Sequence, residues 1–214
     1  LLDQTTFRYG SSRYEKLVPK DCILLMGHEY VILGKEYSTY RMCIPKRKKL
    51  ERILIFFGGS DPDDNTLKTI KLIKKSNFAN KSFDIVVGKN YKGLKLLKDN
   101  LKGSDNFRIH IQLKSLAELI LKADLSIGSG GLVMWERLCL CLPSIVIPIA
   151  ENQVNVSKYI SELGLITFFE NFNNFSKNIN SLEHYFHKGK NAIKKSSIKW
   201  DGLGISRICK IFDY

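Results

Sequence analysis

Residues 125–153, LSIGSGGLVMWERLCLCLPSIVIPIAENQ, are the stretch of the chain that decides its fold. A short apolar run over 125–127 ends in the turn Gly128-Ser129-Gly130-Gly131, and amphipathic spacing then continues from 132 to about 142. A second apolar run follows over 144–149. A strand, a tight turn, a helix and another strand in this order predict a βαβ unit with parallel strands.

The same alternation extends on both sides of this unit. The apolar runs have strand length and β-rich composition, and the segments between them have the spacing of amphipathic helices. The sequence therefore predicts an α/β fold, a Rossmann-like parallel sheet with helices on both faces. The expected strands are 53–57, 82–87, 107–111, 125–127, 144–149 and 165–169.

Several helix boundaries are marked by capping residues. Asp61 followed by Pro62 suits an N-cap and a first helical position. Residues 115–118 (SLAE) have the capping-box pattern and predict a helix to about Lys122. Gly164 is expected to end the helix that begins at Gln153. Residues 1–50 do not continue the alternation and are expected to form a connector rather than a core.

The chain is strongly basic. Its 34 Lys+Arg against 21 Asp+Glu give a net charge of +13 over 214 residues. Only 8 of these 34 are Arg, and the other 26, all Lys, are scattered along the chain. Because Arg is the side chain that binds bases and phosphates in a bidentate manner, we do not expect nucleic acid as the main partner. A basic surface equally suits an anionic small substrate.

Cysteine usage and hydrophobic runs exclude several classes of protein. Five cysteines without a CxxC pair, beside four histidines, favour neither a disulfide framework nor a zinc site. We expect buried thiols in a reducing cytoplasm. No apolar run reaches the ~18 residues of a membrane span. The opening Leu1-Leu2 reads as the end of an earlier strand, so we expect the chain to be a fragment of a longer protein.

The turn at 128–131 is the main candidate binding site. In a parallel sheet, ligands bind beyond the carboxyl ends of the strands, where the order of strands reverses. Glycines allow close approach of a ligand, and the first N–H groups of the following helix favour an anion such as a diphosphate. The alternative is a merely tight turn. Glu136, on the following helix, is suited to accept both hydroxyls of a ribose, or is simply an exposed helical carboxylate.

Two further polar clusters follow strands. Glu151-Asn152-Gln153 suits hydrogen bonds to sugar hydroxyls or phosphate, and Asn152 equally suits a helix cap. Residues 58–61 (GGSD) suit a second anion or sugar contact, or a loop with a cap. The four histidines are far apart and form no catalytic set, and the helical pair His184/His187 is expected at the surface. Trp135 is expected in the core.

A family resemblance rests on five blocks of sequence. In this order they resemble the UDP-2,4-diacetamido-2,4,6-trideoxy-β-L-altropyranose hydrolases of pseudaminic acid biosynthesis. That family is similar in fold to the peptidoglycan N-acetylglucosaminyltransferase, which has the two-domain GT-B architecture. The blocks are LLDQT (1–5), LVPKDCILLMGHEYVIL (17–33), ILIFFGGSDPDDNTLK (53–68), ADLSIGSGGLVMWERLCLCLPSIVIPIAENQ (123–153) and WDGLGISRI (200–208).

The resemblance implies an enzyme that cleaves the bond between the anomeric carbon of a sugar and UDP. Water would be the acceptor, and neither a metal nor another cofactor would be needed, since helix-terminal amides stabilise the leaving diphosphate. The implied UDP-sugar site comprises Ser129, Gly130 and Gly131 for the diphosphate, Glu136 for the ribose, Asn152 and Gln153 for the sugar or nucleotide edge, Leu113 for uracil, and Gly58, Gly59 and Ser60 at the interdomain cleft.

The resemblance also implies a division of the chain. Residues 1–50 would be the end of an N-terminal domain with its connector, 51–200 the nucleotide-sugar-binding domain, and 201–214 a helix that packs toward the N-terminal domain. The family's water-activating His lies in a glycine-rich loop of that domain, and nothing here matches the loop. The chain alone is therefore expected to bind UDP weakly and to hydrolyse nothing.

The expected partners are a UDP-sugar and the N-terminal domain of the same enzyme, with no membrane span and no nucleic acid. Two alternatives remain open at this point. One is a GT-B glycosyltransferase that uses a UDP-sugar donor, and the other is a non-catalytic nucleotide-sugar-binding module.

Overall fold

A computed structural model describes residues 1–6, 10–198 and 200–212 of the chain. Its centre is a six-stranded parallel sheet in the order β5-β4-β3-β6-β7-β8, which confirms the predicted fold class. The strands are β3 (Arg52–Phe56), β4 (Ser82–Val87), β5 (Phe107–Ile111), β6 (Leu125–Gly128), β7 (Ser144–Val146) and β8 (Thr167–Phe168).

The order of strands reverses between β3 and β6. From β3 the chain runs outward through β4 to β5, then returns to β6 on the other side of β3 and continues to β7 and β8. Ile53 pairs with Leu125, and Phe56 pairs with Gly128, so the two neighbouring strands end together. Their carboxyl ends lead into the two glycine-rich turns. A reversal of this kind is where open α/β sheets bind ligands.

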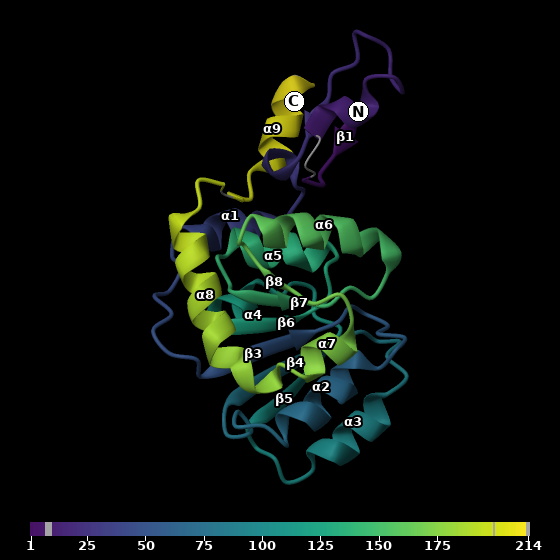
Figure 1. Cartoon of the computed structure of the whole chain (residues 1–214). Coiled ribbons are helices and arrows are strands. Elements are labelled where there is room, and N and C mark those ends of the chain that lie inside the picture. Colours follow the sequence, from purple (N-terminus) through teal and green to yellow (C-terminus); the bar gives the residue numbers. More distant parts are fainter. Residues whose placement is uncertain (7–9, 199, 213–214) are drawn as a thin grey trace.

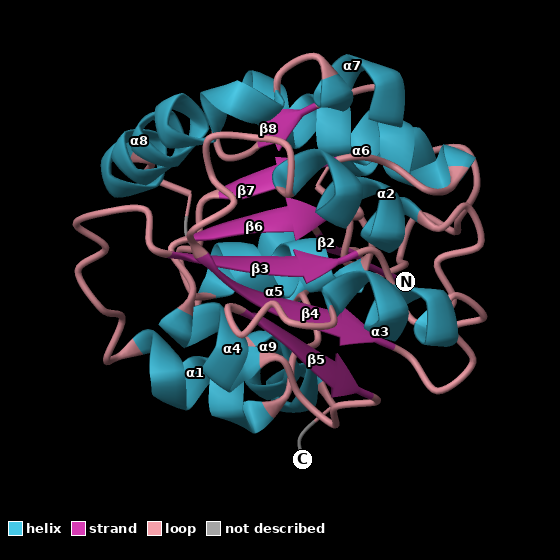
Figure 2. Ribbon diagram, turned by 90° about the horizontal axis from the view of Figure 1, so that it is seen from below, coloured by secondary structure: helices cyan, strands magenta, loops and turns pink. Residues whose placement is uncertain are grey.

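Helices cover both faces of the sheet (Figure 2). Alternate residues of the strands face opposite sides, so Leu54 packs in one core while Ile53 and Ile55 pack in the other. One face carries α1 (Lys35–Arg41), α4 (Ala117–Lys122), α5 (Leu132–Cys139) and α6 (Glu151–Glu162). The other carries α2 (Asn65–Ile73), α3 (Leu94–Leu101), α7 (Phe172–Ser176), η3 (Ile179–Ser181) and α8 (Leu182–Lys195).

The two ends of the chain lie side by side, apart from the large sheet (Figure 1). β1 (Leu2–Asp3) pairs in parallel with β2 (Leu25–Met26). η2 (His28–Tyr30) packs against α9 (Gly204–Ile211), where Arg207 donates a 3.0 Å hydrogen bond to the carbonyl oxygen of Glu29. Before β2 the chain forms η1 (Gly10–Tyr14).

Residues 1–50 are not only a connector. Val31, Leu33 and Tyr37 are buried in the core on the α5 side of the sheet, and Leu50 is buried in the other core. The expectation that this segment contributes no core is therefore wrong at these four positions. Their apolar side chains lie in a polar, proline-punctuated stretch, where no periodicity marks them as buried.

Helix boundaries correct several details of the sequence prediction. α2 begins at Asn65, and Asp61 is not its N-cap; instead the Asp61 carboxylate accepts bonds from the amides of Asn65 (3.0 Å) and Thr66 (2.7 Å). The helix at 117–122 has no capping box, since Ser115 Oγ accepts only from the Ala117 amide, at 3.3 Å. Gly164 ends α6 with φ 77°, as predicted.

Two helices, α3 and α5, and the burial of most cysteines also differ from the sequence prediction. α3 was not predicted, and α5 ends at Cys139 rather than near 142. All five cysteines are free thiols, but only Cys139 is buried and Cys43 is exposed, so the prediction of buried thiols holds at one position. Trp135 lies in the core as predicted, stacked on Trp200 with ring centroids 5.9 Å apart.

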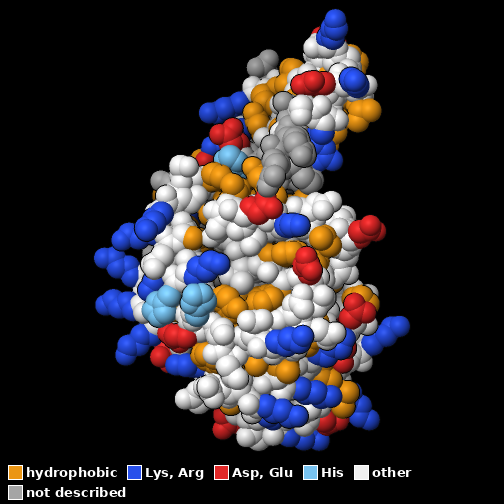
Figure 3. Space-filling view, viewed as in Figure 1, with side chains coloured by type: hydrophobic (Ala, Val, Ile, Leu, Met, Phe, Trp, Pro, Cys, Tyr) orange, Lys and Arg blue, Asp and Glu red, His pale blue; other side chains and the backbone are white. Residues whose placement is uncertain are grey.

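The basic side chains are distributed widely. Lys and Arg side chains are scattered over the face seen in Figure 3 rather than gathered in one stripe. Several guanidinium groups are used inside the molecule: Arg47 donates to the carbonyl oxygens of Ala123, Cys141 and Ile120 at 2.7, 3.1 and 3.0 Å. Arg therefore serves mainly to hold the fold at such positions, while Lys supplies surface charge.

Candidate functional site

A cavity of about 340 Å³ lies at the carboxyl ends of β3, β4 and β5. Gly59 after β3, Gly88 after β4 and Leu113 after β5 line it. α5 contributes Leu132, Val133 and Glu136 to the opposite wall. The cavity therefore gathers three of the predicted site residues, Gly59, Leu113 and Glu136, from distant parts of the sequence.

The loops after β3 and β4 touch at two glycines. The amide of Gly88 donates a 3.1 Å hydrogen bond to the carbonyl oxygen of Gly59. A Cβ atom on Gly88 would lie 2.2 Å from that oxygen, so no larger residue fits there. Gly58 adopts φ 97°, a backbone conformation that favours glycine. Because neither glycine has a side chain, backbone atoms form this part of the cavity rim.

The loop after β5 supplies the floor of the cavity. Gln112 adopts a left-handed φ of 51° while its amide donates to the carbonyl oxygen of Val87 at 2.9 Å. Leu113 follows with 40% of its surface exposed. This strained turn brings Gln112 and Leu113 to the lining of the cavity, the position that the resemblance assigns to uracil.

The glycine-rich turn at 128–131 lies against the end of β3. The amide of Ser129 donates to the carbonyl oxygen of Phe56 at 3.2 Å, and Ser129 is buried. A Cβ atom on Gly128 would lie 1.9 Å from the same carbonyl oxygen, which explains the glycine. The amides of Leu132 and Val133 begin α5 at its positive dipole end, where the first N–H groups of a helix lack an acceptor within it, while the amide of Met134 donates to the carbonyl oxygen of Gly131 at 2.9 Å.

Gln153 joins two motifs that lie far apart in the sequence. Its Oε1 accepts hydrogen bonds from the amides of Gly130 and Ile149, each at 3.1 Å. The amide of Gly130 is thus occupied, and an incoming anion would meet the amides that follow it. Asn152 is exposed, and α6 begins at Glu151 with Ala150 as its N-cap, so Asn152 is not the cap.

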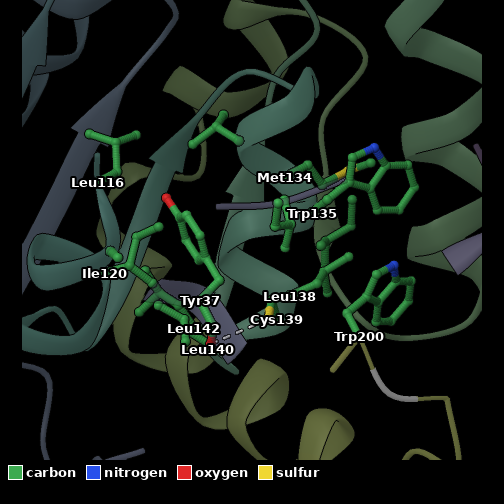
Figure 4. Packing of buried hydrophobic residues seen from close by; sticks show 14 of the residues in the cluster. Tyr37, Leu116, Ile120, Met134, Trp135, Leu138, Cys139, Leu140, Leu142 and Trp200 are labelled. Carbon is green, nitrogen blue, oxygen red and sulfur yellow. Dashed lines mark hydrogen bonds between the residues drawn. The ribbon is translucent and has the colours of Figure 1, made fainter. Parts of the chain in front are cut away.

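Glu136 lies at the wall of the cavity in a partly buried position. Burial raises the pKa of its carboxyl group, and the hydroxyl of Tyr37 and the charge of Arg137 oppose that rise. Tyr37, on α1, is 2% exposed, and its buried hydroxyl lies beside the Glu136 carboxyl group and Ser115. Figure 4 shows this hydroxyl pointing away from Cys139 and toward the Leu116 side of the core. This wall of the cavity therefore combines a partly buried carboxyl group with a buried hydroxyl.

Arg137 is the main feature that sequence reasoning missed. Its side chain is 1% exposed, and its guanidinium donates to the carbonyl oxygen of Ser129, to Ser126 Oγ at 3.2 Å and to the carbonyl oxygen of Val133 at 3.2 Å. An Arg beside Glu136, in a helical segment that is apolar on both sides of this pair, is the one signal that the sequence offers.

Other predicted residues lie outside the cavity lining. Ser60 is exposed, and the carboxylate of its neighbour Asp61 accepts from two amides in the first turn of α2 although Asp61 is not the N-cap residue, which favours the loop-and-cap interpretation of residues 58–61. His184 and His187 are exposed as predicted, and His187 pairs with Glu183 at 3.3 Å. His110 Nε2 lies 2.8 Å from the buried carboxylate of Asp84.

The part of the chain that the structure describes has neither a cluster of metal-ligating side chains nor a membrane-spanning helix. No group of three or more His, Cys, Asp or Glu side chains there is arranged to hold a metal ion. Likewise, no helix in the described part of the chain is both long and apolar enough to cross a membrane.

Comparison with known sequences finds distant relatives that are named for carbohydrate biosynthesis. No protein-family model matches it. It is 24% identical over 157 residues to the spore coat polysaccharide biosynthesis protein SpsG of Bacillus subtilis, covering 73% of this chain and 46% of that protein. It is 25% identical over 154 residues to the UDP-2,4-diacetamido-2,4,6-trideoxy-β-L-altropyranose hydrolase of Campylobacter jejuni, covering 72% of this chain and 54% of that enzyme. The chain thus spans about half the length of these relatives.

Comparison with solved structures identifies the architecture. The spinosyn rhamnosyltransferase SpnG, solved with thymidine diphosphate, superposes with a TM-score of 0.64 and 15% identity over 91% of this chain and 53% of its own. MurG of Acinetobacter baumannii superposes with a TM-score of 0.58 and 13% identity over 92% of this chain and 58% of its own. The chain therefore has the fold of a Rossmann-like domain of the GT-B glycosyltransferases.

Proposed function

We propose that the chain is the nucleotide-sugar-binding half of an enzyme that hydrolyses a UDP-sugar, releasing UDP from a 2,4-diacetamido-2,4,6-trideoxy hexose. The observation that carries the proposal is the cavity at the strand reversal, where Gly59, Leu113 and Glu136 meet the first turn of α5. The similarity to the Campylobacter jejuni hydrolase supports the choice of reaction.

Each part of a UDP group has a matching part of the site. The backbone at Leu113, which lines the cavity, suits the uracil ring, and the Glu136 carboxylate suits the two hydroxyls of the ribose. The diphosphate would lie over the turn from Ser129 to Gly131, facing the free amides at the start of α5. Gly58, Gly59 and Ser60 would face the sugar, with Asn152 at the outer edge. Gln153 would act indirectly, since its amide oxygen already holds the turn.

The reaction breaks the bond between the anomeric carbon and the diphosphate oxygen. That oxygen leaves with the bonding electrons as UDP, while water adds its oxygen to the anomeric carbon and gives one proton to a general base. No histidine lines the cavity in the described part of the chain. We therefore assign the base to another region of the protein, and the positive field at the start of α5 to stabilisation of the leaving diphosphate.

We further propose that a second domain completes the enzyme, with 51–200 as the nucleotide-binding domain and 1–50 and 201–214 as its links to that partner. The half-length match to the relatives and to the GT-B structures supports this division. The two ends of the chain expose apolar side chains where they lie side by side. These are Leu2, Ile23 and Ile205, exposed at 39, 62 and 45%, which suits an apolar contact with further protein.

A glycosyltransferase that uses a UDP-sugar donor is the second candidate, favoured by the GT-B fold itself. A non-catalytic nucleotide-sugar-binding module would use the same cavity. Assay of the whole protein separates the three: a hydrolase releases UDP from the sugar nucleotide in water alone, a transferase requires a sugar acceptor, and a binding module releases none.

Calorimetric titration of the chain tests the binding site. Glu136→Ala should weaken UDP binding by about 1–3 kcal/mol, because a buried polar pairing is lost, and should leave a 2′,3′-dideoxy analogue of UDP unaffected. The matched control is Glu118→Ala, which removes an exposed carboxylate on α4 that pairs only with Lys122. Equal UDP affinity in Glu136→Ala and the unaltered chain, or no UDP binding by the unaltered chain, would overturn the assignment.

A further inference from the structure

Arg137 lies directly beneath the turn at 128–131. Its side chain extends from α5 back toward the start of the helix, as helical side chains do, and reaches the carbonyl oxygens of Ser129 and Val133. A Cβ atom on Gly128 would lie 3.2 Å from its Nη1, so the guanidinium packs against the backbone of the turn itself.

The charge of Arg137 has no anionic partner in contact. All three acceptors of its hydrogen bonds are neutral oxygens, and it forms no ion pair within the described residues. Burial lowers the pKa of Arg137 to about 10, and the carboxylate of Glu136 offsets part of that effect. The side chain therefore stays cationic at neutral pH, although the positive end of the α5 dipole lies on the same side. The charge of Arg137 and the positive end of the α5 dipole therefore lie near the same turn. This arrangement destabilises the fold unless an anion binds beside them.

Arg137 also fixes the direction of the Ser129–Gly130 peptide. In a trans peptide the C=O and N–H point in opposite directions. The C=O of Ser129 points to Arg137, and the N–H of Gly130 points to Gln153. If this peptide turned over, its carbonyl oxygen would face the Oε1 of Gln153, and the hydrogen bonds at both ends of the peptide would be lost.

We propose that Arg137 is a positioning residue that makes the turn at 128–131 selective for a diphosphate, by holding the Ser129 carbonyl inward and by adding a buried positive charge beneath the turn. The inference rests on the proposed function, because it names the group that gives the UDP site its preference for the diphosphate over the nucleoside. Arg137 does not touch the ligand; it acts through the backbone and through its field.

The test compares the affinities of UDP, uridine and inorganic pyrophosphate for the whole chain. Arg137→Met removes the charge and the hydrogen bonds and should lower the ratio of UDP to uridine affinity about tenfold or more. Arg137→Lys keeps the charge and should preserve the ratio within about threefold. The matched control is Arg47→Met, which removes another buried arginine, 9% exposed, that donates to three carbonyl oxygens at the other end of the sheet.

The Arg47→Met control separates a specific effect on ligand selectivity from a general loss of stability. Both Met variants should unfold at lower temperature, but only Arg137→Met should change the ratio. An unchanged ratio in a folded Arg137→Met, or an equal fall in Arg47→Met, would show that Arg137 is merely structural. If Arg137→Met does not fold, Arg137→Gln is used, and an unaltered ratio there overturns the proposal.

Pyrophosphate distinguishes the two proposals. If the unaltered chain binds pyrophosphate but not UDP, the nucleotide assignment fails, and Arg137 is supported only if pyrophosphate binding is lost in Arg137→Met. If the unaltered chain binds none of the three compounds, both proposals fail.

Discussion

Arg137 and Gln153 hold the two ends of one peptide group. The guanidinium of Arg137 donates to the carbonyl oxygen of Ser129, and the Oε1 of Gln153 accepts from the amide of Gly130 at 3.1 Å. The first residue comes from α5 and the second from α6, so the turn after β6 is clamped between the two helices that follow it. A turn held in this way presents a preformed surface to a ligand and pays little ordering entropy on binding.

Gln153→Ala should destabilise the chain because the amides of Gly130 and Ile149 both lose their acceptor. Two unsatisfied backbone donors at a part-buried site imply a loss of about 1–3 kcal/mol in the free energy of unfolding, measured by urea denaturation. The control is Asn155→Ala, an exposed position on the same helix.

Gln153→Glu separates the structural role from the electrostatic one. A carboxylate keeps the acceptor, so its unfolding free energy should lie nearer to that of the unaltered chain than to that of Gln153→Ala. Its negative charge beside the turn should weaken UDP binding about tenfold. UDP affinity equal to that of the unaltered chain would mean that the diphosphate does not lie over this turn.

Gly128→Ala should destabilise the protein strongly, since the new Cβ would lie 1.9 Å from the carbonyl oxygen of Phe56 in the central strand. Neither backbone can move away, because each belongs to the paired strands β3 and β6. We expect a loss of about 1–3 kcal/mol, seen as a lower melting temperature.

Gly59→Ala is the matched control for this substitution. A Cβ atom there would meet nothing within 4 Å, so the melting temperature should be unchanged or slightly raised. A Gly128→Ala variant as stable as Gly59→Ala would show that the turn is not packed against β3 as described.

Glu136→Gln should stabilise the chain at neutral pH. Burial raises the pKa of Glu136 in the folded protein above its ordinary value, so the folded state binds this proton more tightly than the unfolded state. Stability supplied by the protonated carboxyl is therefore present below the ordinary carboxyl pKa and is lost as the pH rises through the folded value. Glutamine cannot ionise, so the variant avoids this loss of stability. It also lacks the carboxylate proposed as the acceptor for the ribose.

Urea denaturation at several pH values checks this prediction. The excess stability of Glu136→Gln over the unaltered chain should grow from pH 4 upward and level off above the folded pKa. Other carboxyl groups contribute equally to both proteins and cancel in the difference. A constant difference across the pH range would place Glu136 in water rather than at a partly buried wall.

Much of the fold could be predicted because its signals are local. The apolar run at 53–57 predicts a strand, and the turn at 128–131 predicts the end of another strand, each from a few neighbouring residues. α3 was missed because Leu94–Leu101 is short and Lys-rich, with only Leu97 and Leu101 buried. Asp61 was misassigned because its carboxylate reaches forward to amides four and five residues on, past an N-cap at Asp64 with φ 55°.

The candidate site was predicted in its parts but not in its connections. Ser129, Gly130 and Glu136 could be named from their places after a strand and on a helix. That Gln153 would bond to Gly130, 23 residues away, depends on how α6 packs beside the turn. The place of the Tyr37 hydroxyl beside Glu136 could not be predicted either, because Tyr37 belongs to a segment without periodicity.

The sequence by itself determined the α/β class, the parallel strands and the glycine-rich turns at their carboxyl ends, because strand length, helical spacing and glycine geometry are properties of neighbouring residues. Only the tertiary structure decided that β3 and β6 are neighbours at the reversal, that Gly59, Leu113 and Glu136 share one cavity, and that the buried charge of Arg137 lies under the turn. Those relations depend on contacts between elements distant in the chain, and burial, not residue type, sets what a charge in such a place can do.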